Sequence, residues 1–546
     1  MMNFFLNKKN ILCKFRSSII LIGLIIFSYI NIQLYYIRFS VADDYLLNNI
    51  ISGTFGNSYD SQLLYINNIL GIIMKFFYII IPNINIYSLY LIIILSICFT
   101  KIIEYVLNKK NYIYLPIILI LYILTLFNIT YTIIAYLSIA MGFIEIFFRK
   151  EKKHYSDYLL IINGTLLRGQ ALIPVLFVLG VVLLFKVLKI KDLKQVINVC
   201  SLSLFCFILV ICGNLIYNTD DTLKEFKKWQ DASIKLRDYK QVEYDKYEQL
   251  LAKIEWNRND LALFYSWNFA DKEKFSVDKI KTIVNNIKIE DRYNLDLKSI
   301  IINFIRQYSI AEFDLNNIYI LIFIITFVMS IRNTKYKREC LYVLIATLFL
   351  HLMLIVRDRY PYRVVYPQYL LAIIYFIYAS GKYDSYNKKI KYIIGINALI
   401  CAVFLGLYIP KYNQISNYYK TLNKETNEFV NQINKDNKLY IMDSKTYNDL
   451  TMNYRISERK NIGEYVFFIK AGGGDCFSKR YYNYVNKYGL KYEDNLYKNL
   501  KQDNVYFIGN VNEILQKYLK ENIDSKYTLN KNETINDFTI FKYMIN

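Results

Sequence analysis

Long uncharged apolar segments alternate with short basic segments over residues 1–217 and 315–410, and residues 218–314 between them are polar and highly charged. The first segment runs from Ser17 to Ile37 and contains no charged residue. Its 21 residues cover about 30 Å as a helix, which is enough to cross the hydrocarbon core of a bilayer. Four basic residues lie between positions 8 and 16, and such residues stay in the cytoplasm. We therefore predict an uncleaved anchor with a cytoplasmic N-terminus.

Residues 62–107 allow two interpretations. If residues 62–81 cross inward and residues 86–107 cross outward, Lys109 and Lys110 lie outside. If residues 62–81 lie flat in the outer interface, residues 86–107 cross inward and the lysines are cytoplasmic. The second interpretation obeys the positive-inside rule and lets a flat helix turn Lys75 to water. We adopt it as the prediction.

Basic residues flank two further apolar segments on both sides, which predicts an even number of crossings in each. Residues 111–144 are uncharged and long enough for two helices that meet in a tight turn near Asn128–Thr130. Between residues 158 and 185 the only charged residue is Arg168. We predict two short or tilted helices there, with Arg168 near the outer turn.

The whole pattern predicts an α-helical polytopic membrane protein with about eleven transmembrane helices, an outer helical insertion and a C-terminal α/β domain. NKLYIMDS and DNVYFIGN have the pattern of buried strands, each followed by a helix. The predicted domains are a transmembrane module with an outer loop at 38–85, an extracytoplasmic helical subdomain, further transmembrane helices and an extracytoplasmic α/β domain, at residues 1–217, 218–314, 315–410 and 411–546.

Composition narrows the class of protein. The chain has 546 residues, of which 55% are apolar, and this excludes a disordered protein. Only 18 Gly, 6 Pro and 8 Cys exclude collagen-like, proline-rich and disulfide-stapled classes, and 2 His argue against a histidine metal site. The net charge of +22 marks the cytoplasmic loops of a membrane protein, so no nucleic-acid partner is predicted. Heavy use of Ile, Asn, Lys and Tyr indicates an AT-rich bacterial genome.

An acidic pair, Asp43 and Asp44, follows the first apolar segment directly. One interpretation is helix capping, because an Asp in a first turn satisfies free N–H groups. The other is general-base catalysis, because repulsion between adjacent carboxylates near a low-dielectric surface raises one pKa. Asp60 in the same loop is a candidate third member.

A short arginine-rich turn, RDRYPYR, is predicted to lie outside, where three arginines are unexpected. The planar guanidinium group donates paired hydrogen bonds to phosphate, so Arg357, Arg359 and Arg363 are candidate phosphate ligands. Contact with lipid headgroups is the alternative. Asp358 is placed to orient one guanidinium group, and Tyr362 belongs to the same motif.

Arg168 lies within GTLLRGQALIP, and a charge inside an apolar stretch is costly unless it has a partner. It either pairs with a backbone carbonyl at a helix break, which Gly164 and Gly169 would permit, or reaches the same anionic group as the arginine-rich turn.

This layout resembles the GT-C superfamily of polytopic membrane glycosyltransferases. The resemblance rests on the acidic pair, the interfacial helix at about 62–81, the segment LLRGQALIPVLFVLG and the C-terminal soluble domain. SVADDYLLNNIISGTFGNSYDSQLLYINNILG and YPYRVVYPQYLL also look like a bacterial membrane-protein family of that type.

The resemblance implies transfer of a sugar from a polyprenyl-phosphate donor to a cell-envelope glycan or lipid acceptor, on the outer face of a bacterial plasma membrane. Asp43 or Asp44 would be the base, and the predicted donor-phosphate ligands are Arg168, Arg357, Arg359 and Arg363. Asp60, Asp358 and Tyr362 would support them. No cofactor is predicted, although the acidic pair could bind a divalent cation. A Trp-Trp-Asp motif is missing from the tail, which argues against transfer onto protein asparagine.

Three alternatives remain open from the sequence. A polysaccharide polymerase or ligase would share recognition of the lipid phosphate. A transporter of lipid-linked glycans should show internal repeats or mid-membrane charges, and the chain offers little beyond His351. An outer-surface binding protein would not need so many spans.

Overall fold

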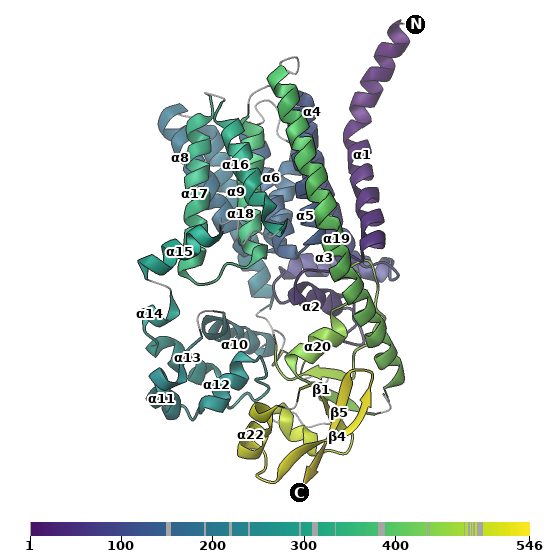
Figure 1. Ribbon diagram of the computed structural model, residues 1–546, viewed down its shortest axis with the longest axis vertical. Helices are drawn as coiled ribbons and strands as arrows, with labels where there is room; N and C mark the ends of the chain where they lie inside the picture. The colour runs from purple at the N-terminus through teal and green to yellow at the C-terminus, as the bar shows by residue number, and fades with distance from the viewer. Residues whose placement is uncertain are drawn as a thin grey trace.

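A computed structural model gives the fold of the chain. It describes residues 2–148, 154–190, 193–217, 221–238, 241–293, 296–307, 315–332, 335–380, 388–433, 435, 437–473, 476–478, 481, 483, 486, 488, 495–510 and 512–545. Figure 1 shows a bundle of long helices, with a layer of short helices and a small sheet at the end opposite the N-terminus. Most of the basic segment at 149–154 and part of the one at 382–391 lie outside the described residues.

Six helices in the described part of the chain are long and apolar enough to cross a membrane. They lie in α1 (Met2–Tyr35), α4 (Ile86–Lys109), α6 (Tyr131–Phe148), α9 (Leu193–Tyr217), α17 (Lys337–Val356) and α19 (Lys388–Gln432). A seventh is obtained if α7 (Tyr155–Leu167) and α8 (Leu172–Ile190), which are bent by 119° where they meet, count as one broken span. The chain therefore folds as a helical, membrane-embedded protein.

The predicted count of about eleven spans is wrong. Two of the predicted spans, α5 (Leu115–Phe127) and α16 (Ile318–Ser330), have 13 residues each and cover only about 20 Å. A third, α18 (Tyr362–Ala379), is buried from Val365 onward, and its Arg, Gln and tyrosine residues leave it less apolar than the six candidate spans. Helices that pack inside a bundle are as apolar as helices that face lipid, so counting uncharged segments overestimates the spans.

Other boundaries agree with the prediction. The turn between α5 and α6 falls at residues 128–130, and the break between α7 and α8 falls at Arg168. Gly164 permits the close contact of α7 with α6, since a side chain there would lie 2.6 Å from the carbonyl oxygen of Ala135.

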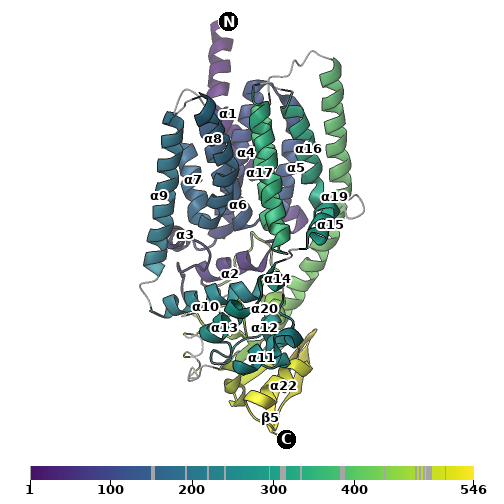
Figure 2. The same cartoon turned by 90° about the vertical axis from the view of Figure 1, so that its left-hand side faces the viewer.

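The basic helix ends gather at one end of the bundle. Arg16 donates a hydrogen bond of 2.5 Å to Asn108, next to Lys109 at the end of α4. The ring of Phe148, at the end of α6, lies 5.3 Å from that of Tyr336, which precedes α17. The N-terminus lies at this end in both views (Figures 1 and 2).

The opposite end carries the polar parts of the chain. A boundary layer is formed by α2 (Ala42–Ile51) and α3 (Asn68–Ile80), and a helical subdomain lies beyond it (Figure 2). The subdomain comprises α10 (Asp221–Arg237), α11 (Tyr244–Lys253), α12 (Arg258–Tyr265), α13 (Val277–Asn286), α14 (Ile289–Arg292) and α15 (Leu297–Gln307). Its core contains Trp229 and Trp256, whose indole N–H groups donate to the carbonyls of Phe275 and Lys274.

The C-terminal domain is a mixed five-stranded sheet in the order β2-β1-β3-β5-β4. Its strands are β1 (Leu439–Met442), β2 (Phe468–Lys470), β3 (Val505–Ile508), β4 (Tyr527–Ile535) and β5 (Phe538–Ile545). The two strands expected from the sequence are β1 and β3, which pair in parallel and are followed by α20 (Ser444–Thr451) and α22 (Glu513–Asn522).

This domain packs directly on α2 and the loop after it. Tyr45 donates a hydrogen bond of 2.7 Å to the carbonyl of Tyr454, and the backbone N–H of Tyr465 donates one of 3.1 Å to Thr54. The segment that carries the acidic pair is therefore held between the bundle and the sheet.

A charged cluster at the polar end of the bundle

Asp44 joins three helices at the boundary layer. Its Oδ1 atom accepts hydrogen bonds from the Tyr87 hydroxyl of α4, at 2.7 Å, and from the Tyr131 backbone N–H at the start of α6, at 2.8 Å. The side chain is fully buried, and its Oδ2 atom has no hydrogen-bond partner among the described residues. Asp44 thus fixes α2 against the ends of α4 and α6.

The pKa of Asp44 is raised to about 7, and α2 lies outside the membrane-spanning segments. Burial is the largest cause, because a low-dielectric surrounding disfavours the charged carboxylate. The bonds from Tyr131 and Tyr87 oppose the rise, and the neighbouring charge of Asp43 adds to it. The sequence predicted one raised pKa in this pair, but it named repulsion as the cause, whereas burial is the larger effect.

Asp43 lies in a different environment. Its Oδ2 atom is 2.5 Å from Nη1 of Arg363, and the two side chains retain 28% and 22% of their exposure. Pro361 lies within the arginine-rich turn and directly precedes α18, so Arg363 belongs to the first turn of a helix that is buried from Val365 onward. A rigid element therefore carries this guanidinium group to the accessible member of the acidic pair.

Arg168 reaches the same region through Tyr131. The backbone at Arg168 is extended, with φ of −157°, because α7 ends there. Its Nη1 atom donates to the Tyr131 hydroxyl at 2.5 Å and to Thr132 at 2.8 Å, and its Nη2 atom donates to Gln170 at 3.3 Å. Since the Tyr131 N–H donates to Asp44, Tyr131 connects Arg168 with the acidic pair. We call Asp43, Asp44, Arg168 and Arg363, together with Tyr131, the charged cluster.

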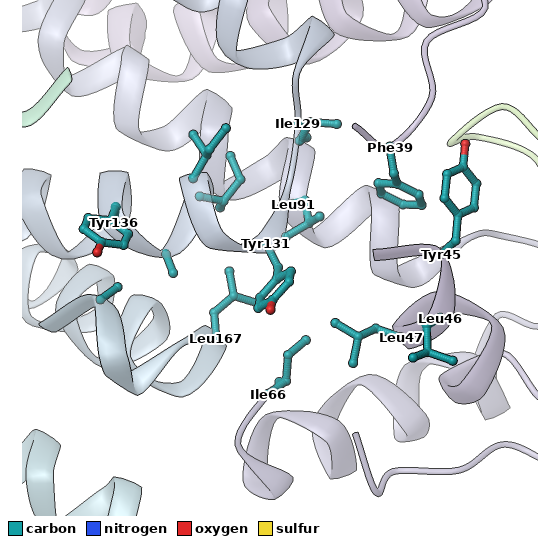
Figure 3. Close-up of a cluster of buried hydrophobic side chains, with 14 of the residues drawn as sticks. Phe39, Tyr45, Leu46, Leu47, Ile66, Leu91, Ile129, Tyr131, Tyr136 and Leu167 are labelled. Atoms are coloured by element: carbon teal, nitrogen blue, oxygen red, sulfur yellow. The ribbon is translucent and has the colours of Figure 1, made fainter. Parts of the chain in front are cut away.

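Apolar side chains form the floor of this cluster. Figure 3 shows the Tyr131 ring among Leu47, Ile66 and Leu167, which come from three different segments. The ring of Tyr65 is nearly parallel to that of Tyr131, at a centroid distance of 6.3 Å. The polar atoms of the cluster therefore lie at the edge of a dry core.

The other predicted site residues are not all part of the cluster. Arg359 pairs with Asp238 of the helical subdomain at 2.9 Å. Arg357 and Asp358 are exposed, and no hydrogen bond or ion pair of the Arg357 side chain is found in the described part of the chain. The carboxylate of Asp60 accepts the Gln62 N–H at 2.9 Å within its own loop.

Tyr362 contributes packing near the cluster. Its ring stacks on that of Tyr366 at 5.1 Å, one turn further along α18. It also lies 5.9 Å from the ring of Tyr319 on α16. Tyr362 therefore holds the start of α18, on which Arg363 lies, against α16.

Arg237 was not predicted from the sequence. It is the last residue of α10, its side chain is only 3% exposed, and its guanidinium carbon lies 4.0 Å from the centroid of the Trp267 ring. Its Nε and Nη1 atoms have no hydrogen-bond partner among the described residues. Burial lowers the pKa of Arg237, while Asp238, Tyr65 and Asp43 oppose this effect, so the charge belongs to the cluster. Arg237 lies in a densely charged segment, and nothing in that pattern distinguishes it from its neighbours.

A cavity of about 310 Å³ adjoins Arg168. It lies between the start of α3, the break between α7 and α8, α9 and α10, and its polar lining includes Tyr65, Asn68, Arg168, Gln170, Asn214 and Asp231. The Oδ1 atom of Asn68 is buried without a hydrogen-bond partner among the described residues. Amide, carboxylate and aromatic groups of this kind suit a ligand rich in hydroxyl groups.

Among the residues that the structure describes, no three or more His, Cys, Asp or Glu side chains form a group that could hold an ion. The acidic pair offers two carboxylates, and Asp43 is already paired with Arg363.

No protein-family model matches the chain, and a search of curated proteins finds no significant match. The fold and cluster by themselves define a helical membrane protein with a charged site at the polar end of its bundle.

Proposed function

We propose that this protein is a membrane glycosyltransferase of the GT-C type. It would move a sugar from a polyprenyl-phosphate donor to a glycan or lipid acceptor of the cell envelope. The observation that carries the proposal is the pairing of Asp43 with Arg363 beside Arg168, at the boundary between the apolar bundle and the polar domains. A lipid-linked donor needs this combination of a cationic site for its phosphate and an apolar route for its chain.

The orientation follows from charge. The basic ends near Arg16 and Lys109 lie opposite the charged cluster, and basic segments remain in the cytoplasm. We therefore place the cluster and the C-terminal domain on the outer face of a bacterial plasma membrane, with a cytoplasmic N-terminus.

Asp43 is the better candidate for the base, since Asp44 is sealed by Tyr87 and Tyr131. In the proposed step, the acceptor hydroxyl oxygen bonds to the anomeric carbon and gives its proton to Asp43. The bond from that carbon to the donor phosphate breaks, and the leaving lipid phosphate takes the electron pair. Arg168 and Arg363 would neutralise the charge that develops on the phosphate, which is usually a large catalytic term. Asp44 acts as a positioning residue.

The cavity beside Arg168 would hold the hydroxyl-bearing part of a substrate. It is of the size that a small-molecule pocket requires, and its amide and aromatic lining is close to the guanidinium group. The exposed Arg357 of the arginine-rich turn would add to the positive charge available to the phosphate.

The test compares Asp43→Asn and Arg363→Gln with the exposed control Glu248→Gln, each as the full chain expressed in the producing cell. Mass spectrometry of the cell-envelope glycan should show the loss of one sugar for both site variants, because a missing base alone lowers the rate about a hundredfold or more. The control should leave the glycan unchanged. An unaltered glycan in a well-expressed Asp43→Asn variant would refute the base assignment, and loss of whole oligosaccharides would indicate a polymerase or ligase instead.

A further inference from the structure

A second cavity lies at the same boundary, on the other side of the turn between α5 and α6. Its volume is about 190 Å³, and it is bounded by residues 38–40 after α1, by that turn and by α19. The lining combines basic, aromatic and hydroxyl groups, chiefly Arg38, Ser40, Phe127, Lys411, Tyr412 and Tyr419. The charged cluster does not share these residues.

Arg38 supplies a guanidinium group that aromatic rings hold in place. Its central carbon lies 3.5 Å from the centroid of the Tyr419 ring and 5.8 Å from that of Tyr45. The Nε atom is buried and has no hydrogen-bond partner among the described residues. A guanidinium group fixed by stacking can donate paired hydrogen bonds to a phosphate at little entropic cost.

The surroundings of the cavity are those of a lipid site. Ile30 and Leu34 of α1 and Val403 and Leu407 of α19 are exposed large apolar side chains on two candidate membrane spans. Val403 and Leu407 precede Lys411 by two turns and one turn of the same helix. Ile30 and Leu34 lie on the last turns of α1, before the chain leaves the helix and reaches Arg38. An apolar surface therefore leads to the basic opening.

The turn between α5 and α6 separates this cavity from the charged cluster. Asn128 lines the cavity, and the Ser40 N–H donates to the Ile129 carbonyl at 3.5 Å, which fixes the end of α1 to the turn. Tyr131, three residues after Asn128, faces Asp44 and Arg168 on the other side.

We propose that this cavity binds the phosphate headgroup of an anionic membrane lipid, whose chains lie along α1 and α19. Two basic residues provide charge complementarity, the tyrosine hydroxyls and Ser40 supply further hydrogen bonds, and the exposed apolar faces receive the chains. The proposal does not depend on the enzymatic activity proposed above.

Native mass spectrometry of the full chain, titrated with phosphatidylglycerol, tests it. Arg38→Gln should weaken binding of the tightest lipid about tenfold, Tyr419→Leu should weaken it less, and Arg38→Lys should retain part of it. The matched control is Lys420→Gln, an exposed lysine on the same helix, and it should bind as the wild type does. Thermal unfolding of each variant shows that the fold is intact.

Two further arms identify the ligand. Inorganic phosphate in large excess should not displace phosphatidylglycerol, because it lacks the chains that lie on α1 and α19, and displacement would indicate a small-anion site. Zwitterionic phosphatidylcholine should bind more weakly than phosphatidylglycerol. Equal binding of the two lipids, or equal effects of Arg38→Gln and Lys420→Gln, would overturn the proposal.

Discussion

Asp43 and Asp44 are neighbours in the sequence but occupy opposite environments. Asp43 retains a quarter of its exposure and forms an ion pair with Arg363, whereas Asp44 is buried and has one carboxylate oxygen without a hydrogen bond among the described residues. Successive residues of a helix lie about 100° apart, so one faces the site and the other faces the bundle. The two acids therefore have different roles, which their adjacency conceals.

The raised pKa of Asp44 predicts a characteristic pH dependence of stability. A carboxyl group with a folded pKa of about 7 and an unfolded pKa of 3.8 binds more protons in the folded state between these values. Stability is then highest below pH 3.8 for this group and falls as the pH rises to 7. The loss is on the order of 4 kcal/mol.

Asp44→Asn should remove this dependence, because an amide does not titrate. Thermal unfolding of the wild type and the variant between pH 4 and pH 8 is the measurement, with the exposed Glu248→Gln as control. The melting temperature of the wild type should fall relative to that of Asp44→Asn with increasing pH. Parallel curves for the two proteins would contradict the raised pKa.

At the scale of elements, α15 is an amphipathic helix that no apolar segment of the sequence marked as membrane-associated. Leu297, Ile301 and Ile305 recur every four residues and are exposed together with Ile302. A neighbouring side of the helix packs on α17, where the Phe304 ring lies 5.9 Å from that of His351. Arg306 lies at the edge of the apolar stripe, and Lys298 lies within its arc in the first turn, where a long side chain can extend to water.

We expect α15 to rest in the interface and to anchor the helical subdomain there. The variant Ile301→Trp is reconstituted in nanodiscs, and the tryptophan fluorescence of the wild type is subtracted from its signal. Brominated lipids should quench the remaining fluorescence strongly. Lys281→Trp, on an exposed position of α13 in the same subdomain, should escape quenching. Similar quenching of both variants would show that α15 is not inserted.

Helix ends were easier to predict than helix neighbours. Asn128–Thr130 and Arg168 mark the ends of helices because a polar interruption and a costly charge are local signals. The contact between Asp43 and Arg363 joins residues 320 positions apart, and no local signal specifies which helices become adjacent. Counting membrane crossings could place both residues at one end of the bundle, but only the structure shows that they form a pair.

The span count failed for a related physical reason. The short helices α5 and α16 are as apolar as the lipid-facing helix α9, and only their length separates them from a membrane span. The burial of Arg237 could not be predicted from the sequence either, since its contact with Trp267 depends on how the helical subdomain folds.

At the scale of the whole molecule, the distribution of basic residues makes orientation testable. Alkaline phosphatase fused after residue 546 should be active in the producing cell, because the C-terminal domain is expected outside. A green fluorescent protein fused at the N-terminus should fluoresce, as it would remain in the cytoplasm. A fluorescent C-terminal fusion with an inactive phosphatase would reverse the proposed orientation and place the charged cluster inside.

The length of α19 has a mechanical consequence. Its 45 residues form one helix of about 68 Å, whose last turns bring Phe429 within 4.9 Å of the Phe538 ring in the sheet. Pro410 is the one proline within it and marks where bending is easiest. The part of α19 after Pro410 would act as a lever arm, so a bend at the proline would displace the sheet relative to α2. Bilayer thickness or lateral pressure could thereby set the strain on the segment that bears the two carboxylates.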